Sequence, residues 1–257
     1  MKNQIRNPFV FTKKICFMQR IADLVRSGHT RYLLGEIQIE KAGFFSAKMD
    51  FYYGCFHNNK DQFRTRESGF CGARLLFLYT ENSPTLTWIL LVTNGNWLMP
   101  ESGHQRWLDV KEERITITNY QLVRLVKKKK LASVSAENTE PKRAYTQRNR
   151  SDFTWTWTYT REQQDKLRDQ IVMSIRRHRT EELRQLIDTI YRSPAFSGVR
   201  EQVKKFVKLM KAEWTRTGVG DMPELPKGLG YVRRLPDKGK LLTEIMKGME
   251  NANRKEE

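Results

Sequence analysis

Cationic side chains recur at helical spacing toward the end of the chain. The set is Arg200, Lys204, Lys205, Lys208 and Lys211, with four of the five at positions i, i+4, i+8 and i+11. On a helix that rises 1.5 Å per residue, this array would form a ridge about 16 Å long. Such a ridge suits a row of backbone phosphates, whose neutralisation releases counterions. A solvated helix face has the same pattern, but only Glu201 and Glu213 stand nearby to neutralise it.

Two other basic segments accompany the ridge. Residues 127–150 hold eight basic and two acidic side chains in a connection that is long for an ordinary loop. Its cations are Lys127, Lys128, Lys129, Lys130, Lys142, Arg143, Arg148 and Arg150. A shorter cluster contains Arg176, Arg177 and Arg179. We predict that all of these bind phosphates, the alternative for the long segment being a solubilising insert.

Residues that could carry catalysis are few and scattered. His29 lies in a polar, basic turn and is a candidate general acid or base, with helix capping as the alternative role. Asp109 and Lys111, with Glu81 or Glu101 upstream, faintly match the carboxylates and lysine of metal-dependent nucleases. The sequence has no His-x-His pair and no glycine-rich phosphate loop, so we expect neither a metal nor a cofactor.

An aromatic ladder occupies residues 153–159. Phe153, Trp155, Trp157 and Tyr159 alternate with three threonines, which is typical of a strand. Exposed rings on a sheet can stack with bases. Large rings also contribute strongly to a core, and helices must cover one face of the sheet. We therefore predict that the rings are buried under helices and that the threonine side faces solvent.

The totals limit the protein class. The 257 residues carry a net charge of +18, which favours a polyanionic or acidic partner. Three cysteines without a CxxC pair indicate a reducing compartment, and the N-terminus lacks the apolar core of a secretory signal. The longest strongly apolar run is Trp88 to Val92, far short of a membrane span. We expect a cytoplasmic protein with no membrane partner.

Periodicity predicts the secondary structure. Helices are expected over 13–27 and about 39–53, and strands over 70–79, 86–92, 114–118, 120–126 and 153–159. Thr160 and Gln163 form a capping-box pattern at the start of a helix, and Leu183 to Tyr191 form the next apolar stripe. Ser193 and Pro194 are expected to begin a third helix that carries the cationic ridge. Residues 251–257 are expected to fray.

These elements predict an α+β protein. An antiparallel sheet of about five strands, with packed helices and the basic loop, would occupy residues 1–159. A three-helix segment (160–217) and an extended C-terminal arm (218–257) would follow, and the arm is a possible contact for other protein subunits. The expected function is nucleic-acid binding, DNA or RNA, within a complex such as one from a mobile element. A nuclease and a basic scaffold for an acidic protein are the alternatives.

Overall fold

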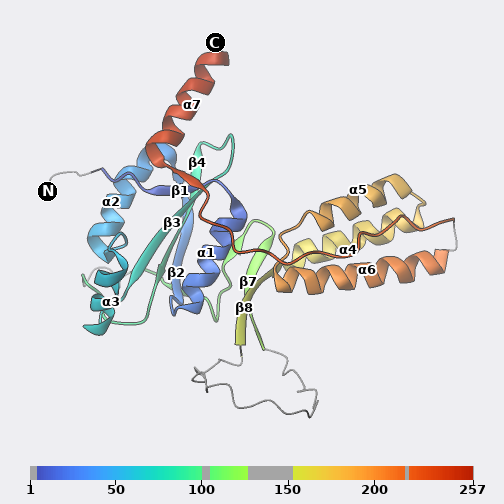
Figure 1. The fold of residues 1–257 in the computed structure, drawn as a ribbon, viewed down its shortest axis with the longest axis horizontal. Helices are drawn as coiled ribbons and strands as arrows, with labels where there is room; N and C mark the ends of the chain where they lie inside the picture. The colour runs from blue at the N-terminus through green and yellow to red at the C-terminus, as the bar shows by residue number, and fades with distance from the viewer. Residues whose placement is uncertain (1–4, 100–104, 127–152, 218–219, 257) are drawn as a thin grey trace, which may run out of the picture.

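The computed structural model describes residues 5–99, 105–126, 153–217 and 220–256 (Figure 1). These residues form an α+β fold, as predicted. In chain order the elements are β1 (Phe9–Phe11), α1 (Lys14–Arg26), β2 (Arg31–Gln38), η1 (Ile39–Lys41), α2 (Ala42–Tyr53), α3 (Asn59–Glu67), β3 (Ala73–Tyr79), β4 (Thr85–Val92), β5 (Leu108–Asp109), β6 (Thr116–Ile117), β7 (Tyr120–Val126), β8 (Phe153–Tyr159), α4 (Arg161–Arg176), α5 (Thr180–Tyr191), α6 (Ser197–Thr217), β9 (Gly239–Leu241) and α7 (Leu242–Glu256).

The strands form two sheets, so the single five-stranded sheet is only roughly correct. Among the described residues the larger sheet has six strands in the order β5-β2-β4-β3-β1-β9, and the smaller has three in the order β6-β7-β8. The larger sheet is mixed because β1 runs parallel to β3, whereas its other pairs are antiparallel. Strands β1 and β9 have three residues each, which is too short to show a period.

Both faces of the larger sheet are buried. Phe11, Leu78 and Ile89 belong to the core that includes α1, whereas Phe77 and Leu90 belong to the core on the other face. That second core also contains residues of α2 and α7. The alternation of β3 and β4 residues between the two cores follows the two-residue period of a strand.

Helix α1 joins the two sheets. Its Phe17, Met18 and Ile21 are fully buried, and the helix contacts both β3 and β8. Trp157 of β8 is also fully buried, and its indole Nε1 donates to the Met18 carbonyl at 2.9 Å. The buried N–H of the largest side chain in this core is therefore satisfied by α1 itself.

The prediction for the aromatic ladder is confirmed in part. Trp157 and Tyr159 are buried, but Phe153 is 37% exposed beneath the Arg124 guanidinium. The prediction that the threonine side faces solvent is wrong at Thr156, which is buried. The first turn of α6 covers it, and Thr156 Oγ1 accepts from Ser197 Oγ at 2.8 Å and from the Gly198 N–H at 3.2 Å.

Helices α4, α5 and α6 form a bundle that extends from the smaller sheet (Figure 1). Gln202 Nε2 donates to Gln164 Oε1 at 2.8 Å near the start of α6 and α4, and Arg176 pairs with Glu213 near the end of both. Helices α4 and α6 are therefore parallel and in contact, and α5, which packs on α4, carries the chain back toward the smaller sheet.

Two predicted helix starts have different outcomes. Thr160 caps α4 as predicted, since its Oγ1 accepts from the Gln163 N–H at 3.2 Å. The predicted start at Ser193 and Pro194 is wrong, because α6 begins at Ser197. The Ser193 hydroxyl instead bonds with Tyr159 and with the Thr189 carbonyl.

The C-terminal arm is extended only over residues 220–238, which we call the strap. The strap runs back along the bundle to the larger sheet (Figure 1), where the chain adds β9 beside β1. Its Leu225, Leu229, Val232 and Leu235 pack against the core that includes α1. The chain then forms α7, which extends to Glu256. The prediction that residues 251–257 fray is therefore wrong for residues 251–256. No helix among the described residues is both long and apolar enough to cross a membrane.

The contact between α6 and β8 generates the first prediction. A Cβ added at Gly198 would lie 2.5 Å from the Trp157 carbonyl oxygen and 2.6 Å from Thr158 Cγ2. We expect Gly198→Ala to lower the free energy of unfolding by about 1–3 kcal/mol through overpacking. Guanidinium unfolding midpoints measure the change.

Gly248→Ala in α7 is the matched control, because nothing lies within 4 Å of a Cβ at that position. The control should be neutral or more stable by up to about 1 kcal/mol, since alanine favours a helix. A Gly198→Ala protein as stable as the parent would contradict the close approach of α6 to β8.

Candidate nucleic-acid interface

Three arginines surround one carboxylate at the end of α1. The Asp23 oxygens lie 3.2 Å from Arg20 Nη1, 3.4 Å from Arg26 Nη1 and 2.9 Å from Arg234 Nη2. Arg20 is three residues before Asp23 and Arg26 is three residues after it, so Arg20, Asp23 and Arg26 lie on one face of α1. Arg234 comes from the strap, and Arg20 also pairs with Asp237. Two carboxylates face these three guanidiniums, so an excess of positive charge remains here.

The strap is fixed on α1 by a side-chain amide. Gln19 Nε2 donates to the Arg233 carbonyl at 2.8 Å, and Gln19 Oε1 accepts from the Leu235 N–H at 3.1 Å. Farther along, the Val232 N–H donates to the Ala195 carbonyl at 3.3 Å. These bonds determine where Arg234 and Tyr231 lie, because both residues belong to the same short stretch of backbone.

Arg26 connects α1 to the smaller sheet. Its Nη2 donates to the Trp155 carbonyl at 2.7 Å while Nη1 faces Asp23. The guanidinium thus bridges the ladder strand and the arginine cluster. Its side chain remains half exposed, at 49%, so the remaining edge of the group is accessible to a ligand.

An aromatic ring and a guanidinium stack on the opposite side of this region. Arg200 Cζ lies 3.7 Å from the centroid of the Tyr231 ring. Hydrogen bonding with Arg200 and the charge of Arg200, with a smaller contribution from Lys204, lower the pKa of the Tyr231 phenol. Tyr231 is nevertheless 80% exposed, the highest value among the exposed large hydrophobic side chains of the described residues.

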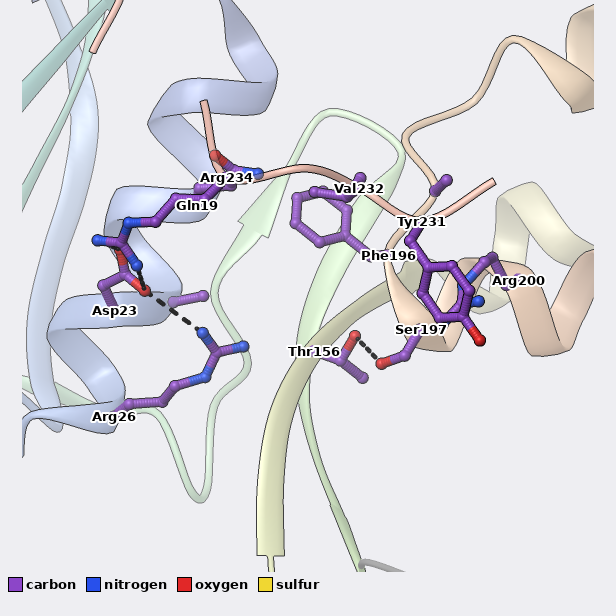
Figure 2. Close-up of a pocket in the computed structure, with 12 residues that line it drawn as sticks. Gln19, Asp23, Arg26, Thr156, Phe196, Ser197, Arg200, Tyr231, Val232 and Arg234 are labelled. Atoms are coloured by element: carbon purple, nitrogen blue, oxygen red, sulfur yellow. Dashed lines mark hydrogen bonds and ion pairs between the residues drawn. The ribbon is translucent and has the colours of Figure 1, made fainter. Parts of the chain in front are cut away.

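These groups line one hollow, which we call the junction groove (Figure 2). It has a volume of about 250 Å³ and lies between α1, β8, the start of α6 and the strap. Figure 2 shows Asp23, Arg26 and Arg234 on one side, and Arg200 with Tyr231 on the other. Arg20 Nε and Arg200 Nε are buried and lack a hydrogen-bond partner among the described residues. The groove region therefore combines unneutralised charge with unused donors.

The predicted ridge continues from the groove along α6. Lys204, Lys205, Lys208 and Lys211 are all exposed. At about 100° per residue, Arg200, Lys204, Lys208 and Lys211 fall within about 80° of one another on the helix. Lys204 pairs with Glu201 at 3.0 Å, whereas Lys208 and Lys211 form no ion pair with a described residue. Arg200 lines the groove and also begins the ridge, so the two surfaces are continuous.

The other predicted cations are divided between two places. Arg176 and Arg216 both pair with Glu213 near the ends of α4 and α6. Arg179 pairs with Glu182 at 2.9 Å, and Arg177 is the exposed C-cap residue of α4. The predicted residues Arg176, Arg177 and Arg179 thus lie at the end of α4 remote from the groove. The cations of residues 127–150 lie outside the described residues.

His29 is buried in the turn that follows α1. Its Nδ1 lies 3.1 Å from the Leu24 carbonyl and 3.1 Å from Ser27 Oγ, just beyond the end of α1. Burial lowers the pKa of His29 to about 4, and the charges of Arg66 and Arg74 add to this shift, against an opposing effect of the Leu24 hydrogen bond. The imidazole is therefore neutral near pH 7 and caps the helix.

The carboxylates of the nuclease-like pattern do not converge. Asp109 lies in edge strand β5, where its Oδ1 accepts from the Lys111 N–H at 2.8 Å. In the strand register Asp109 of β5 lies opposite Arg31 of β2, and Arg31 lies opposite Val92 of β4. Glu81 lies in the turn before Thr85, at the other end of β4. At about 3.3 Å per residue along β4, the two carboxylates are about 20 Å apart. Glu101 lies outside the described residues, and no group of three metal-ligating side chains occurs among those that are described.

A second hollow, of about 430 Å³, contains two tyrosines. Tyr120 and Tyr159 are stacked with centroids 5.2 Å apart, and the Tyr159 hydroxyl donates to Ser193. Burial raises the pKa of Tyr159 to about 12 and also raises the pKa of Tyr120. Both phenols thus stay protonated near neutral pH.

Sequence reasoning identified the ridge but missed the junction groove. Arg20, Arg26, Tyr231 and Arg234 had no local pattern that linked them, because they meet only when the strap returns to α1. No protein-family model, curated protein or solved structure matches this chain. Its function is therefore inferred from the geometry of these residues.

The environment of His29 predicts a loss of stability in acid. Above pH 6.5 the imidazole is neutral in both the folded and unfolded chain. As the pH falls from 6.5 toward 4, the unfolded chain binds a proton that the folded protein excludes, so unfolding becomes easier. The full shift corresponds to about 3 kcal/mol.

We expect His29→Gln to reduce this acid sensitivity, measured as the difference between urea midpoints at pH 7.5 and pH 4.5. His57→Gln, at an exposed histidine, is the control and should behave like the parent. If the parent and His29→Gln lose equal stability between the two pH values, the buried neutral state of His29 is refuted.

Proposed function

We propose that this protein binds nucleic acid, mainly through backbone phosphates, as a subunit of a nucleic-acid-handling complex. The observation that supports the proposal most strongly is the continuity of the junction groove with the α6 ridge through Arg200. Arg20, Arg26 and Arg234 pair with two carboxylates, Asp23 and Asp237, so this region retains an excess of positive charge. Arg200 adds a fourth guanidinium on the other side of the groove. Beyond it, exposed lysines extend the charge in one direction.

The shape of this surface favours a polyanionic chain over a compact acidic partner. The cations follow a line from the end of α1, across Arg200, and along α6 to Lys211. From Arg200 to Lys211 alone the line covers about 16 Å. Arginine also recognises phosphate oxygens in pairs through its planar fork of donors, a geometry that lysine lacks.

The salt dependence of binding tests the proposal. We expect the observed affinity for short DNA and RNA to fall linearly with salt on a log–log scale, because each phosphate contact releases counterions. Replacing Lys204, Lys208 and Lys211 by Gln together should reduce the slope by about 2–3, since each phosphate contact accounts for about 0.7–0.9 of it. Fluorescence anisotropy with labelled oligonucleotides across a salt series measures both quantities.

The matched control replaces Lys41, Lys48 and Lys60 by Gln. These exposed lysines lie around α2 and α3, on the other flank of the larger sheet, and their replacement changes the net charge by the same amount. The slope should then stay near the parent value. Absence of binding at low salt, or equal slopes for both triple variants, would exclude the ridge as a phosphate contact. Competition by polyglutamate as strong as by an oligonucleotide of equal charge would favour an acidic protein partner.

A further inference from the structure

Tyr231 is unusual because it is held in place and yet exposed. Its neighbour Val232 packs on the core and donates its N–H to the Ala195 carbonyl, while Gln19 holds the strap two residues later. The ring itself is 80% exposed. A large ring in this position contributes little burial to the fold, so its placement is better explained by a ligand than by packing.

One face of the ring is available. The Arg200 guanidinium lies over the ring at 3.7 Å from the centroid and covers one side. With 80% of the residue still in contact with solvent, the opposite side is open. A planar group stacked there would complete a sandwich of guanidinium, phenol and ligand, a common way to hold a nucleobase.

Groups that can bind a phosphate lie across the junction groove from this platform. Arg234 follows Tyr231 by three residues along the extended strap, so their Cα atoms are about 10 Å apart. Arg26 and Arg234 share Asp23 from the far side of the groove, and both side chains are about half exposed or more, at 49% and 71%. The Tyr231 ring therefore lies on one side of the groove, and the Arg26 and Arg234 guanidiniums lie on the other (Figure 2).

The arrangement selects for an unpaired strand. In a duplex the faces of each base are covered by its neighbours, so a ring on the protein surface can stack only on a single-stranded or extruded base. The hollow, about 250 Å³, is also smaller than the about 300–1,000 Å³ of pockets that enclose a drug-sized ligand. It has no room for a helix, so only part of a single strand can enter it.

We propose that the junction groove binds one nucleotide of a single strand, with its base stacked on Tyr231 and its phosphate paired with Arg26 and Arg234. This inference rests on the proposed nucleic-acid binding and adds to it a preference for single strands. The ridge would then contact the phosphates that follow along the same strand.

The test compares Tyr231→Ala with the parent on two labelled ligands, a 12-nucleotide oligothymidylate and a 12-base-pair duplex. The variant should bind the single strand about five- to 150-fold more weakly, which corresponds to the about 1–3 kcal/mol of one stacked base. Duplex affinity should change by less than about twofold, because no phosphate contact is removed. The salt slope should stay at the parent value for the same reason.

Three controls make the result specific. Tyr231→Trp should retain single-strand affinity, since a larger ring still stacks. Phe63→Ala removes an exposed aromatic side chain from α3, away from the groove, and should have no effect. An abasic 12-nucleotide strand, which keeps its phosphates, should bind the parent and Tyr231→Ala equally.

The outcomes separate this inference from the proposed function. If the parent binds neither ligand at low salt, the proposed function fails. If the parent binds both and Tyr231→Ala weakens both equally or neither, nucleic-acid binding stands and the stacking site is overturned. Arg234→Gln provides a second readout: it should weaken single-strand binding and lower the salt slope by about 0.7, and an unchanged slope would overturn the phosphate assignment.

Discussion

The burial of α1 between two sheets is the constraint on which the rest of the structure depends. One side of the helix packs on the larger sheet, and its backbone accepts the indole N–H of Trp157 from the smaller one. This contact positions β8, and β8 in turn seats the first turn of α6 through Thr156. Arg26 on α1 and Arg200 on α6 lie on opposite sides of the junction groove. The positions of both therefore depend on one buried helix, α1.

The strap supplies two further residues of the junction groove, Tyr231 and Arg234. A flexible arm would leave Arg234 and Tyr231 free to sample many positions, and ordering them on a ligand would cost conformational entropy. Here the amide of Gln19 and the apolar residues of the strap hold the backbone before any ligand arrives. The pairing of β9 with β1 anchors the far end. The groove residues are thus held in place by the fold, which would favour affinity for the proposed ligand.

Sequence patterns predicted the parts of the protein that are local. The stripe of α1, the hairpin of β3 and β4, the Thr160 cap and the exposed ridge all follow from residues near one another in the chain. The predictions that were wrong concern residues whose contacts come from distant parts of the sequence. Short strand β1 owes its existence to β3 and β9, and Thr156 is buried only because α6 returns to it. The same reason explains why the groove was missed, since Asp23 and Arg234 meet across more than two hundred residues.

The late position of the strap in the chain sets an order of events during synthesis. A growing polypeptide that has just left the ribosome with α6 complete already displays the lysine ridge, but the strap with Tyr231 and Arg234 is still to come. On the proposed function, the lysines assigned to backbone phosphates would therefore emerge from the ribosome before the residues assigned to base stacking.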